Sequence, residues 1–145
     1  GAAQFGSVLD AEPELWERLS RVNVLGTLHA TRAVLPGMIA RRRGDVINVA
    51  STAGEKAAAG TGPYSASKAA VLRLTEALAA EVRKHDVRVT ALLPSTVNTE
   101  MAAGLGLKIG PADRMLQPED VAELVVATLA LPARVFVRDV SLLTT

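Results

Sequence analysis

Apolar residues recur at helical spacing in three stretches of the chain, and short continuous apolar runs follow each of them. A continuous run of β-branched and other apolar residues is typical of a strand that is buried on both faces. The order is therefore helix, strand, helix, strand, helix, strand, which favours an α/β fold with a parallel sheet and right-handed crossovers. The expected helices cover residues 10–43, 63–85 and 119–131, and the expected strands cover 45–51, 87–93 and 134–143.

The first helical stretch contains residues that indicate where it starts and stops. Asp10 is a candidate N-terminal cap, because its side chain can accept a hydrogen bond from the first turn, and Pro13 suits that turn. Gly26 lies inside the stretch, so we predict a short helix, a bend over residues 23–26 and a longer helix ending near residue 43. Gly44 then serves as the predicted terminator.

Composition limits the classes of function. The chain has 145 residues, of which 49% are hydrophobic and 21% charged, so we expect one globular domain. The net charge of +1 gives no strong field for nucleic acid or an anionic membrane, and no apolar run approaches a membrane span. The sequence has no Cys and only two His, which argues against disulfides and a metal site. We expect a cytoplasmic protein.

Four polar residues are candidates for chemistry. Tyr64 and Lys68 are four residues apart on a predicted helix, so their side chains lie on one face about a turn apart. Ser51 lies at the carboxyl end of a predicted strand, where ligands gather in open α/β sheets. Asn23 lies at the predicted bend. Taken singly, each also has a plain structural interpretation. Tyr64 would begin a helix, Lys68 would be a solvated cation and Ser51 would lead into a turn. Asn23 would hydrogen-bond backbone groups at the bend.

Together these positions form a pattern that resembles the short-chain dehydrogenase/reductase family. The family has a strand ending in Asn-x-x-Ser-x-Ala-Gly and then Tyr-x-Ala-Ser-Lys on a helix. It also has a Val-Asn-x-x-Gly segment and a Pro-Gly-x-Val-x-Thr loop that meets the cofactor. The matching segments here are Val22-Asn23-Val-Leu-Gly26, Asn48-Val-Ala-Ser51-Thr-Ala-Gly54, Tyr64-Ser-Ala-Ser-Lys68 and Pro94-Ser95-Thr-Val97-Asn-Thr99.

The resemblance implies an oxidoreductase that uses NAD or NADP to interconvert a ketone and a secondary alcohol. Tyr64 would be the acid and base, and a nearby Lys68 ammonium would lower its pKa. Lys68 would also bind the nicotinamide ribose, and Ser51 would stabilise the substrate oxygen. Asn23 would hold a water that relays protons. The loop of Pro94, Ser95, Val97 and Thr99 would meet the nicotinamide.

The sequence departs from the family pattern in two places. It has no glycine-rich Thr-Gly-x-x-x-Gly-x-Gly turn for the cofactor phosphates, and Ser95 stands where the family usually has Gly. The resemblance therefore implies an incomplete Rossmann-like doubly wound sheet. We expect residues 1–145 to be the C-terminal part of one NAD(P)-binding catalytic domain, inactive alone.

Two further expectations concern the substrate and partners. Between residues 101 and 115, Met101, Leu105, Leu107 and Ile109 line an apolar substrate pocket or belong to a loosely packed loop. By the resemblance, the two long helices would form a homodimer or homotetramer. An interaction fragment without catalytic activity is the alternative function, and no motif favours a metal- or phosphate-binding protein of another kind.

Overall fold

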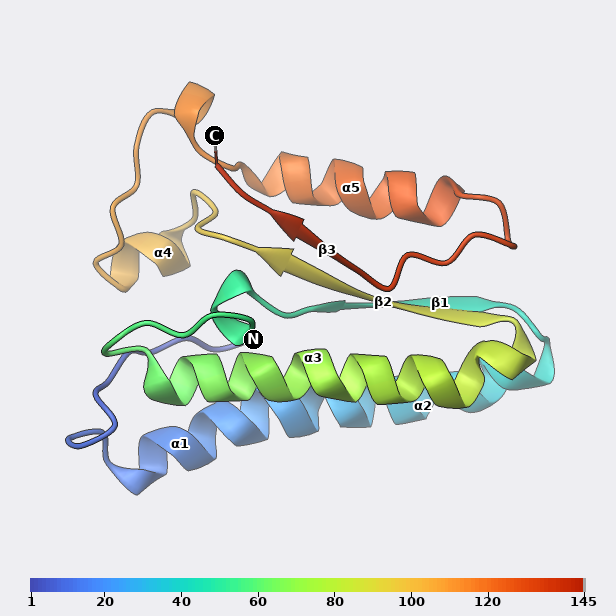
Figure 1. Cartoon of the computed structure of the whole chain (residues 1–145), viewed down its shortest axis with the longest axis horizontal. Coiled ribbons are helices and arrows are strands. Elements are labelled where there is room, and N and C mark those ends of the chain that lie inside the picture. The colour runs from blue at the N-terminus through green and yellow to red at the C-terminus, as the bar shows by residue number, and fades with distance from the viewer. Residues whose placement is uncertain (145) are drawn as a thin grey trace.

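A computed structural model of the chain, which describes residues 1–144, contains one sheet of three parallel strands with helices on both sides (Figure 1). Helices α2 and α3 lie together on one side, and α5 lies on the other. The predicted alternation of helix and strand and the parallel α/β fold are confirmed. The strands are β1 (Gly44–Val49), β2 (Val87–Pro94) and β3 (Asp139–Leu142), in the order β1-β2-β3.

The first helical stretch is continuous, and a π-helical turn overlaps the predicted bend. Helix α1 (Pro13–Leu19) leads into a π-helical turn, η1 (Ser20–Leu25), and then into α2 (Gly26–Ala40). Gly26 keeps helical dihedral angles of −59° and −45°, so it does not break the helix. A π-turn inserts one extra residue without ending the helix, and such turns are frequent at functional sites.

Asp10 was predicted as the cap of this stretch and Gly44 as its terminator, and both predictions are wrong. Glu12 occupies the N-cap position of α1 without a side-chain hydrogen bond, whereas Asp10 accepts a hydrogen bond from Ser7 Oγ at 2.8 Å. At the other end, Arg42 takes the left-handed conformation with a φ of 50°. Because Arg42 is the left-handed residue of this turn, Gly44 does not terminate the helix and is the first residue of β1.

The second predicted helix is the most deeply buried of the helices. Helix α3 (Gly62–Val82) continues through a 3-10 turn, η3 (Arg83–His85), so the predicted helix over residues 63–85 is confirmed. Another 3-10 turn, η2 (Thr52–Gly54), directly follows the carboxyl end of β1. These elements hold the residues of the Ser51 and Tyr64 motifs close to the sheet.

The region after β2 is less regular, as expected, but contains a helix that the pattern did not predict. This helix, α4 (Glu100–Gly104), is too short to show a helical period, and a 3-10 turn, η4 (Ala112–Arg114), follows it. Helix α5 (Pro118–Ala130) agrees with the prediction. Strand β3 begins at residue 139 instead of 134, because residues 131–135 form a loop whose carbonyls accept hydrogen bonds from the Arg88 guanidinium.

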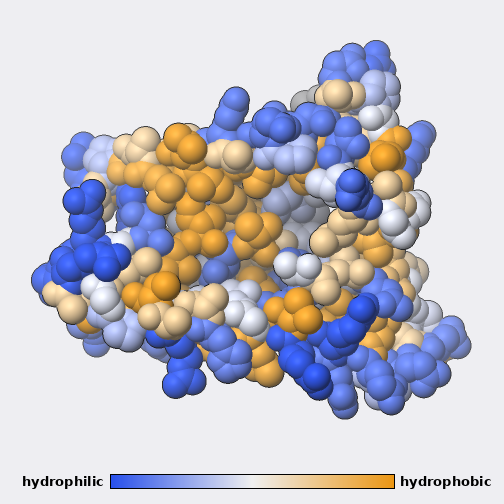
Figure 2. All heavy atoms as spheres, turned by 180° about the vertical axis from the view of Figure 1, so that it is seen from behind, coloured by the Kyte–Doolittle hydropathy of each residue, from blue (hydrophilic) through white to orange (hydrophobic). Residues whose placement is uncertain are grey.

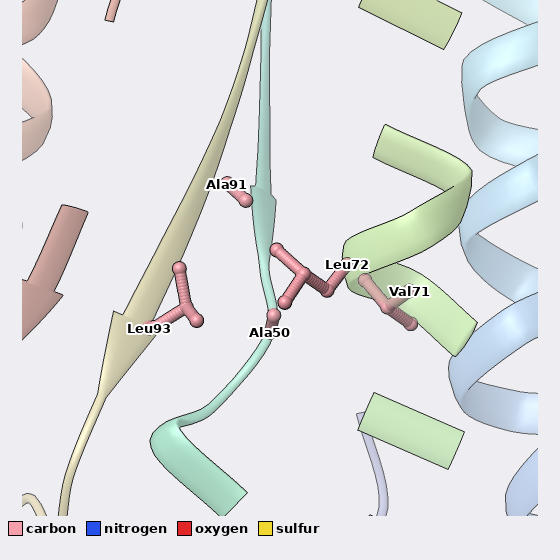
Figure 3. Close-up of a cluster of buried hydrophobic side chains, with 5 residues drawn as sticks. All are labelled: Ala50, Val71, Leu72, Ala91 and Leu93. Atoms are coloured by element: carbon pink, nitrogen blue, oxygen red, sulfur yellow. The ribbon is translucent and has the colours of Figure 1, made fainter. Parts of the chain in front are cut away.

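The core lies between α3 and the sheet. In one cluster, Leu72 points from α3 toward Ala50, and Leu93 comes from β2 (Figure 3). Burying a side chain the size of leucine or valine contributes about 1.5–3 kcal/mol. A second cluster joins α3 to the far end of the sheet and consists of Leu78, Ala79, Val82, Val87 and Val89.

Part of the molecular surface is apolar. Apolar side chains remain exposed on α5 (Val126 and Leu129), on the loop before β3 (Phe136) and at the end of β1 (Val49). Figure 2 shows apolar surface extending over the side that faces away from the viewer in Figure 1. Among residues 1–144, no helix is long and apolar enough to cross a membrane.

Candidate functional site

A cavity of about 390 Å³ lies at the carboxyl edge of the sheet, where β1 and β2 end. The amino end of α3 and the short helix α4 lie at this same edge (Figure 1). Ligands of open α/β proteins bind at this edge, and 390 Å³ lies within the range of small-molecule sites. All eight predicted site residues line the cavity: Asn23, Ser51, Tyr64, Lys68, Pro94, Ser95, Val97 and Thr99.

Tyr64 and Lys68 project from the first turns of α3. The Lys68 Nζ atom lies 5.8 Å from the centroid of the Tyr64 ring and donates a hydrogen bond to the carbonyl oxygen of Val49 at 3.0 Å. Phe5 meets the Tyr64 ring edge-on, with 5.9 Å between ring centroids. The phenol is thus held between an aromatic edge and an ammonium group.

Burial shifts both groups toward their uncharged forms. The pKa of Tyr64 is raised above its usual 10.0, because desolvation of the phenolate outweighs the opposing effect of the Ser51 hydroxyl. Burial likewise lowers the pKa of Lys68 below its usual 10.5. The net direction for Tyr64 is opposite to the lowering expected from Lys68. Helical spacing predicts that two groups are close, but it does not predict how deeply they are buried.

Ser51 lies at the turn that connects β1 to η2. Its Oγ atom accepts a hydrogen bond from the Ala53 backbone N–H at 3.2 Å and donates one to the Pro94 carbonyl at 3.4 Å. Gly54 allows this turn to contact α3, since a Cβ atom there would lie 2.8 Å from the backbone carbon of Lys68. The glycine of the motif therefore lets the serine turn approach α3 closely.

Asn23 connects the π-helical turn to the chain start and to α3. Its Oδ1 atom accepts the Ala2 N–H at 2.8 Å, and its Nδ2 group donates to the Ala2 carbonyl at 2.9 Å. Nδ2 also donates to Ser67 Oγ at 3.0 Å, and Ser67 donates to the Tyr64 carbonyl at 2.8 Å. The buried amide thus fixes both Ala2 and the first turn of α3.

The predicted cofactor loop follows β2 and keeps ordinary backbone geometry. Within residues 1–144, only Arg42 and Asp86 among non-glycine residues have a positive φ, so Ser95 needs no glycine-like conformation. Ser95 N–H donates to the Leu142 carbonyl at 2.9 Å, which fixes the loop to β3. Thr99 caps α4 by accepting the Ala102 N–H at 3.2 Å.

The other wall of the cavity is apolar. Met101 and Leu105 come from α4 and the residue after it, and Leu107 comes from the following loop. Ile109 is not among the lining residues and is 41% exposed, so three of the four apolar residues line the cavity.

Phe5 and Ser67 contact the predicted site residues but were not themselves predicted. Phe5 lines the cavity and contacts Tyr64, although no motif surrounds it in the sequence. Ser67 lies inside the quoted motif, between Tyr64 and Lys68, but only its hydrogen bonds show what its side chain contacts. Among residues 1–144, no group of three or more His, Asp or Glu residues is arranged to hold a metal ion.

The site and fold have counterparts in known proteins. Residues 1–109 match the family described as short chain dehydrogenase. The chain is 37% identical over 141 residues to an uncharacterized oxidoreductase of Staphylococcus saprophyticus, covering 97% of this chain and 59% of that protein. The chain spans about 60% of the length of the curated relatives that it matches.

Solved structures give the same result. The closed form of serine dehydrogenase complexed with NADP+ superposes with a TM-score of 0.85 at 31% identity, covering 98% of this chain and 61% of that one. A 3-oxoacyl-[acyl-carrier protein] reductase with bound NAD from Brucella melitensis gives a TM-score of 0.79 at 31% identity. That match covers 95% of this chain and 55% of that one. Related structures therefore contain nicotinamide cofactors.

Proposed function

Since the chain belongs to the short-chain dehydrogenase family, we propose that its site transfers hydride between a nicotinamide cofactor and a ketone or secondary alcohol. The supporting observation is that Ser51, Tyr64 and Lys68 all line one cavity at the carboxyl edge of the sheet. An apolar wall forms another side of the same cavity. We propose that the Tyr64 phenol and the Ser51 hydroxyl meet the same ligand oxygen in this cavity.

Tyr64 acts as the proton donor during reduction. Because its pKa is raised above 10.0, the phenol is protonated near neutral pH and can give its proton to the carbonyl oxygen. With ligand bound, the Ser51 hydroxyl turns away from the Pro94 carbonyl and donates its hydrogen bond to that oxygen as negative charge develops there. In the oxidation direction the Tyr64 phenolate accepts the proton, and the raised pKa lowers the fraction of Tyr64 that is ionised near neutral pH.

The residues around Lys68 fit the nicotinamide ribose. Lys68 Nζ makes one protein hydrogen bond, to Val49, which leaves N–H groups free for ribose hydroxyls. A Cβ atom at Gly1 would lie 3.6 Å from Lys68 Nζ, so glycine keeps space open there. Val97 and Thr99 would meet the carboxamide. When bound, the nicotinamide supplies or accepts the hydride.

The phosphate end of the cofactor has no glycine-rich turn within these 145 residues. We therefore propose that residues 1–145 act as the C-terminal part of one nicotinamide-binding domain and bind NAD or NADP weakly alone. Titration of the purified 145-residue chain with each nucleotide checks this proposal. Tight binding or ketone turnover by this chain would contradict it.

Self-association through the long helices is proposed as a second property. Ala66, Ala77 and Ala80 are exposed on α3, and small side chains permit close packing of helices. Val34 is likewise exposed on α2, at 48%. Sedimentation analysis of the chain and of an Ala77→Arg variant tests this point, since the arginine should shift the protein toward monomer. Association without any turnover by the protein from its complete gene would favour the interaction-fragment alternative.

The oxidoreductase proposal is tested with a cofactor that carries deuterium at the reactive ring carbon. The protein expressed from its complete gene is mixed with this reduced cofactor and a panel of ketones. Deuterium on the carbinol carbon of the product is the expected result. Absence of labelled alcohol across the panel, with both NADH and NADPH, would count against the function.

A further inference from the structure

The composition of the cavity wall restricts the substrate class. We infer that the site takes an uncharged carbonyl compound with an apolar chain, and that it discriminates against carbonyl compounds whose chain ends in a carboxylate. This inference rests on the proposed function, because it assumes that the ligand oxygen meets Ser51 and Tyr64. It goes beyond the proposed function by specifying the polarity of the part of the ligand that does not react.

The first observation is the charge of the lining. Twenty-two residues line the cavity, and Lys68 is the only one whose side chain carries a charge. None of the lining residues is an Arg, His, Asp or Glu. A carboxylate on the ligand would therefore have only Lys68 as a cationic side-chain partner.

Lys68 is poorly placed to serve that purpose. Its ammonium donates to the Val49 carbonyl, and it projects from the same helix as Tyr64, one turn further along. A ligand whose carbonyl meets Tyr64 and whose chain lies against the α4 residues presents its reacting end to α3. Lys68 then faces the reacting end of the ligand.

The far end of the ligand meets side chains without polar hydrogen-bonding groups. Met101, Leu105 and Leu107 form this wall, and the nearest charged neighbours in the chain, Glu100 and Lys108, are exposed and do not line the cavity. Placing a carboxylate against such a wall removes its water without returning a hydrogen bond. A methyl group at the same position gains free energy from burial.

The apolar wall is also loosely packed, which favours the binding of ligands of different shapes over the binding of one fixed shape. A Cβ atom at Gly104 or Gly106 would have no neighbour within 4 Å, so the segment that carries this wall borders open space at these positions. Methionine is a flexible side chain that adapts to differently shaped partners. We therefore expect selection by polarity, with affinity increasing by about fourfold for each added methylene.

The test uses two ligands of equal length. Methyl propyl ketone and levulinate differ only in that a carboxylate replaces the terminal methyl group. Binding to the protein expressed from its complete gene is followed by the NMR signal of the Met101 methyl group, assigned by its loss in Met101→Leu. Met38, which packs against the buried Leu78 cluster, gives an internal control signal that should not move.

Methyl propyl ketone should bind at least about tenfold more tightly than levulinate, and butyl methyl ketone about fourfold more tightly again. Equal or tighter binding of levulinate would overturn the inference. A protein that shows this order of affinity but transfers no hydride would contradict the proposed function and leave the inference standing.

A variant pair tests whether the apolar wall is responsible. Leu105→Lys should reduce the preference for the ketone over levulinate by about tenfold or more, because it adds a cation to the wall. Leu129→Lys makes the same change on α5, where Leu129 is 45% exposed and does not line the cavity, and should leave the preference unchanged. An unchanged preference in Leu105→Lys would overturn the inference, and the affinities of the parent protein test it even if that variant does not fold.

Discussion

The two walls of the cavity are built differently. The polar wall, defined by Asn23, Ser51, Tyr64 and Lys68, comes from elements that pack against the sheet, and Asn23 is 3% exposed. The apolar wall, defined by Met101, Leu105 and Leu107, comes from a five-residue helix and a loop, and Met101 is 52% exposed. The groups that would react are fixed in place, while the groups that would select the ligand are free to adapt.

This difference has a clear physical basis. A proton donor must lie within hydrogen-bond reach of its acceptor, so a small displacement is costly. Burial of apolar surface is not directional, so the apolar wall tolerates small movements. Substitutions in the polar wall should therefore affect rate, stability and pKa, whereas substitutions in the apolar wall should affect ligand preference.

The largest expected effect is that of Tyr64→Phe. Removing the phenol removes the proton donor, so ketone turnover by the protein from its complete gene should fall about 10²–10⁴-fold. Cofactor affinity should change little, because Lys68 keeps its hydrogen bond to Val49. Met101→Ala is the matched change in the apolar wall and should lower turnover less than tenfold. Similar losses in both variants would remove the distinction between the walls.

Ser51→Ala should have the next largest effect. Loss of the hydroxyl removes one donor to the reacting oxygen, and such donors contribute about 10²–10³-fold in rate. The same hydroxyl lowers the pKa of Tyr64 in the folded protein, so this pKa should rise further in the variant. Ultraviolet titration of tyrosinate measures the shift directly in the 145-residue chain, because Tyr64 is its only tyrosine. A lower pKa in Ser51→Ala would contradict the proposed contact.

Glycine substitutions compare how tightly the two walls are packed. Gly54→Ala places a Cβ atom 2.8 Å from the Lys68 backbone, so it should reduce the free energy of unfolding by about 1–3 kcal/mol. Gly104→Ala in α4 meets no atom within 4 Å and should be neutral or slightly stabilising. Urea unfolding followed by the fluorescence of Trp16, the only tryptophan, reports both values. Equal losses of unfolding free energy in the two variants would show that the two walls are equally tightly packed.

The smallest effect concerns stability at alkaline pH. The folded-state pKa of Tyr64 lies above the usual 10.0, so the unfolded chain loses this proton first as pH rises. The contribution of Tyr64 to stability is therefore complete below pH 10 and is lost as pH rises through its folded pKa. The Tyr64→Phe variant should not show this loss of stability at alkaline pH. Lys68 has the opposite shift, but it is present in both chains and cancels in the comparison.

Urea unfolding of the parent and Tyr64→Phe chains at neutral pH and above pH 10 measures this difference. The expected result is that the parent loses more free energy of unfolding than the variant over this interval. A larger loss in the variant would show that the phenol is not stabilised in its protonated form.

The sequence predicted the elements with a long, regular pattern. Helix α3 and strand β2 agree with prediction because each has enough residues to show its period. Helix α4 has five residues and no period, so it was not predicted. The sequence predicts a bend near Asn23 because Gly26 has a low helix propensity, whereas the structure has a π-turn there.

The residues of the site were predictable only where a sequence motif identifies them. The motifs identified residues that do line one cavity, including Ser51 and Tyr64. Phe5 could not be found in this way, because its position depends on how the chain start packs against α3. The direction of the Tyr64 pKa shift was also missed, since burial depends on tertiary packing and not on the spacing to Lys68.

The central claim is that the Tyr64 phenol gives its proton to the carbonyl oxygen. It is tested by measuring kcat/KM for ketone reduction across alkaline pH and comparing it with the tyrosinate titration of Tyr64. The titration is isolated as the difference in absorbance between the parent and Tyr64→Phe proteins. We predict that kcat/KM falls along the same curve, above pH 10, as the phenol loses its proton. Ketone reduction that continues undiminished after Tyr64 has ionised would contradict the claim.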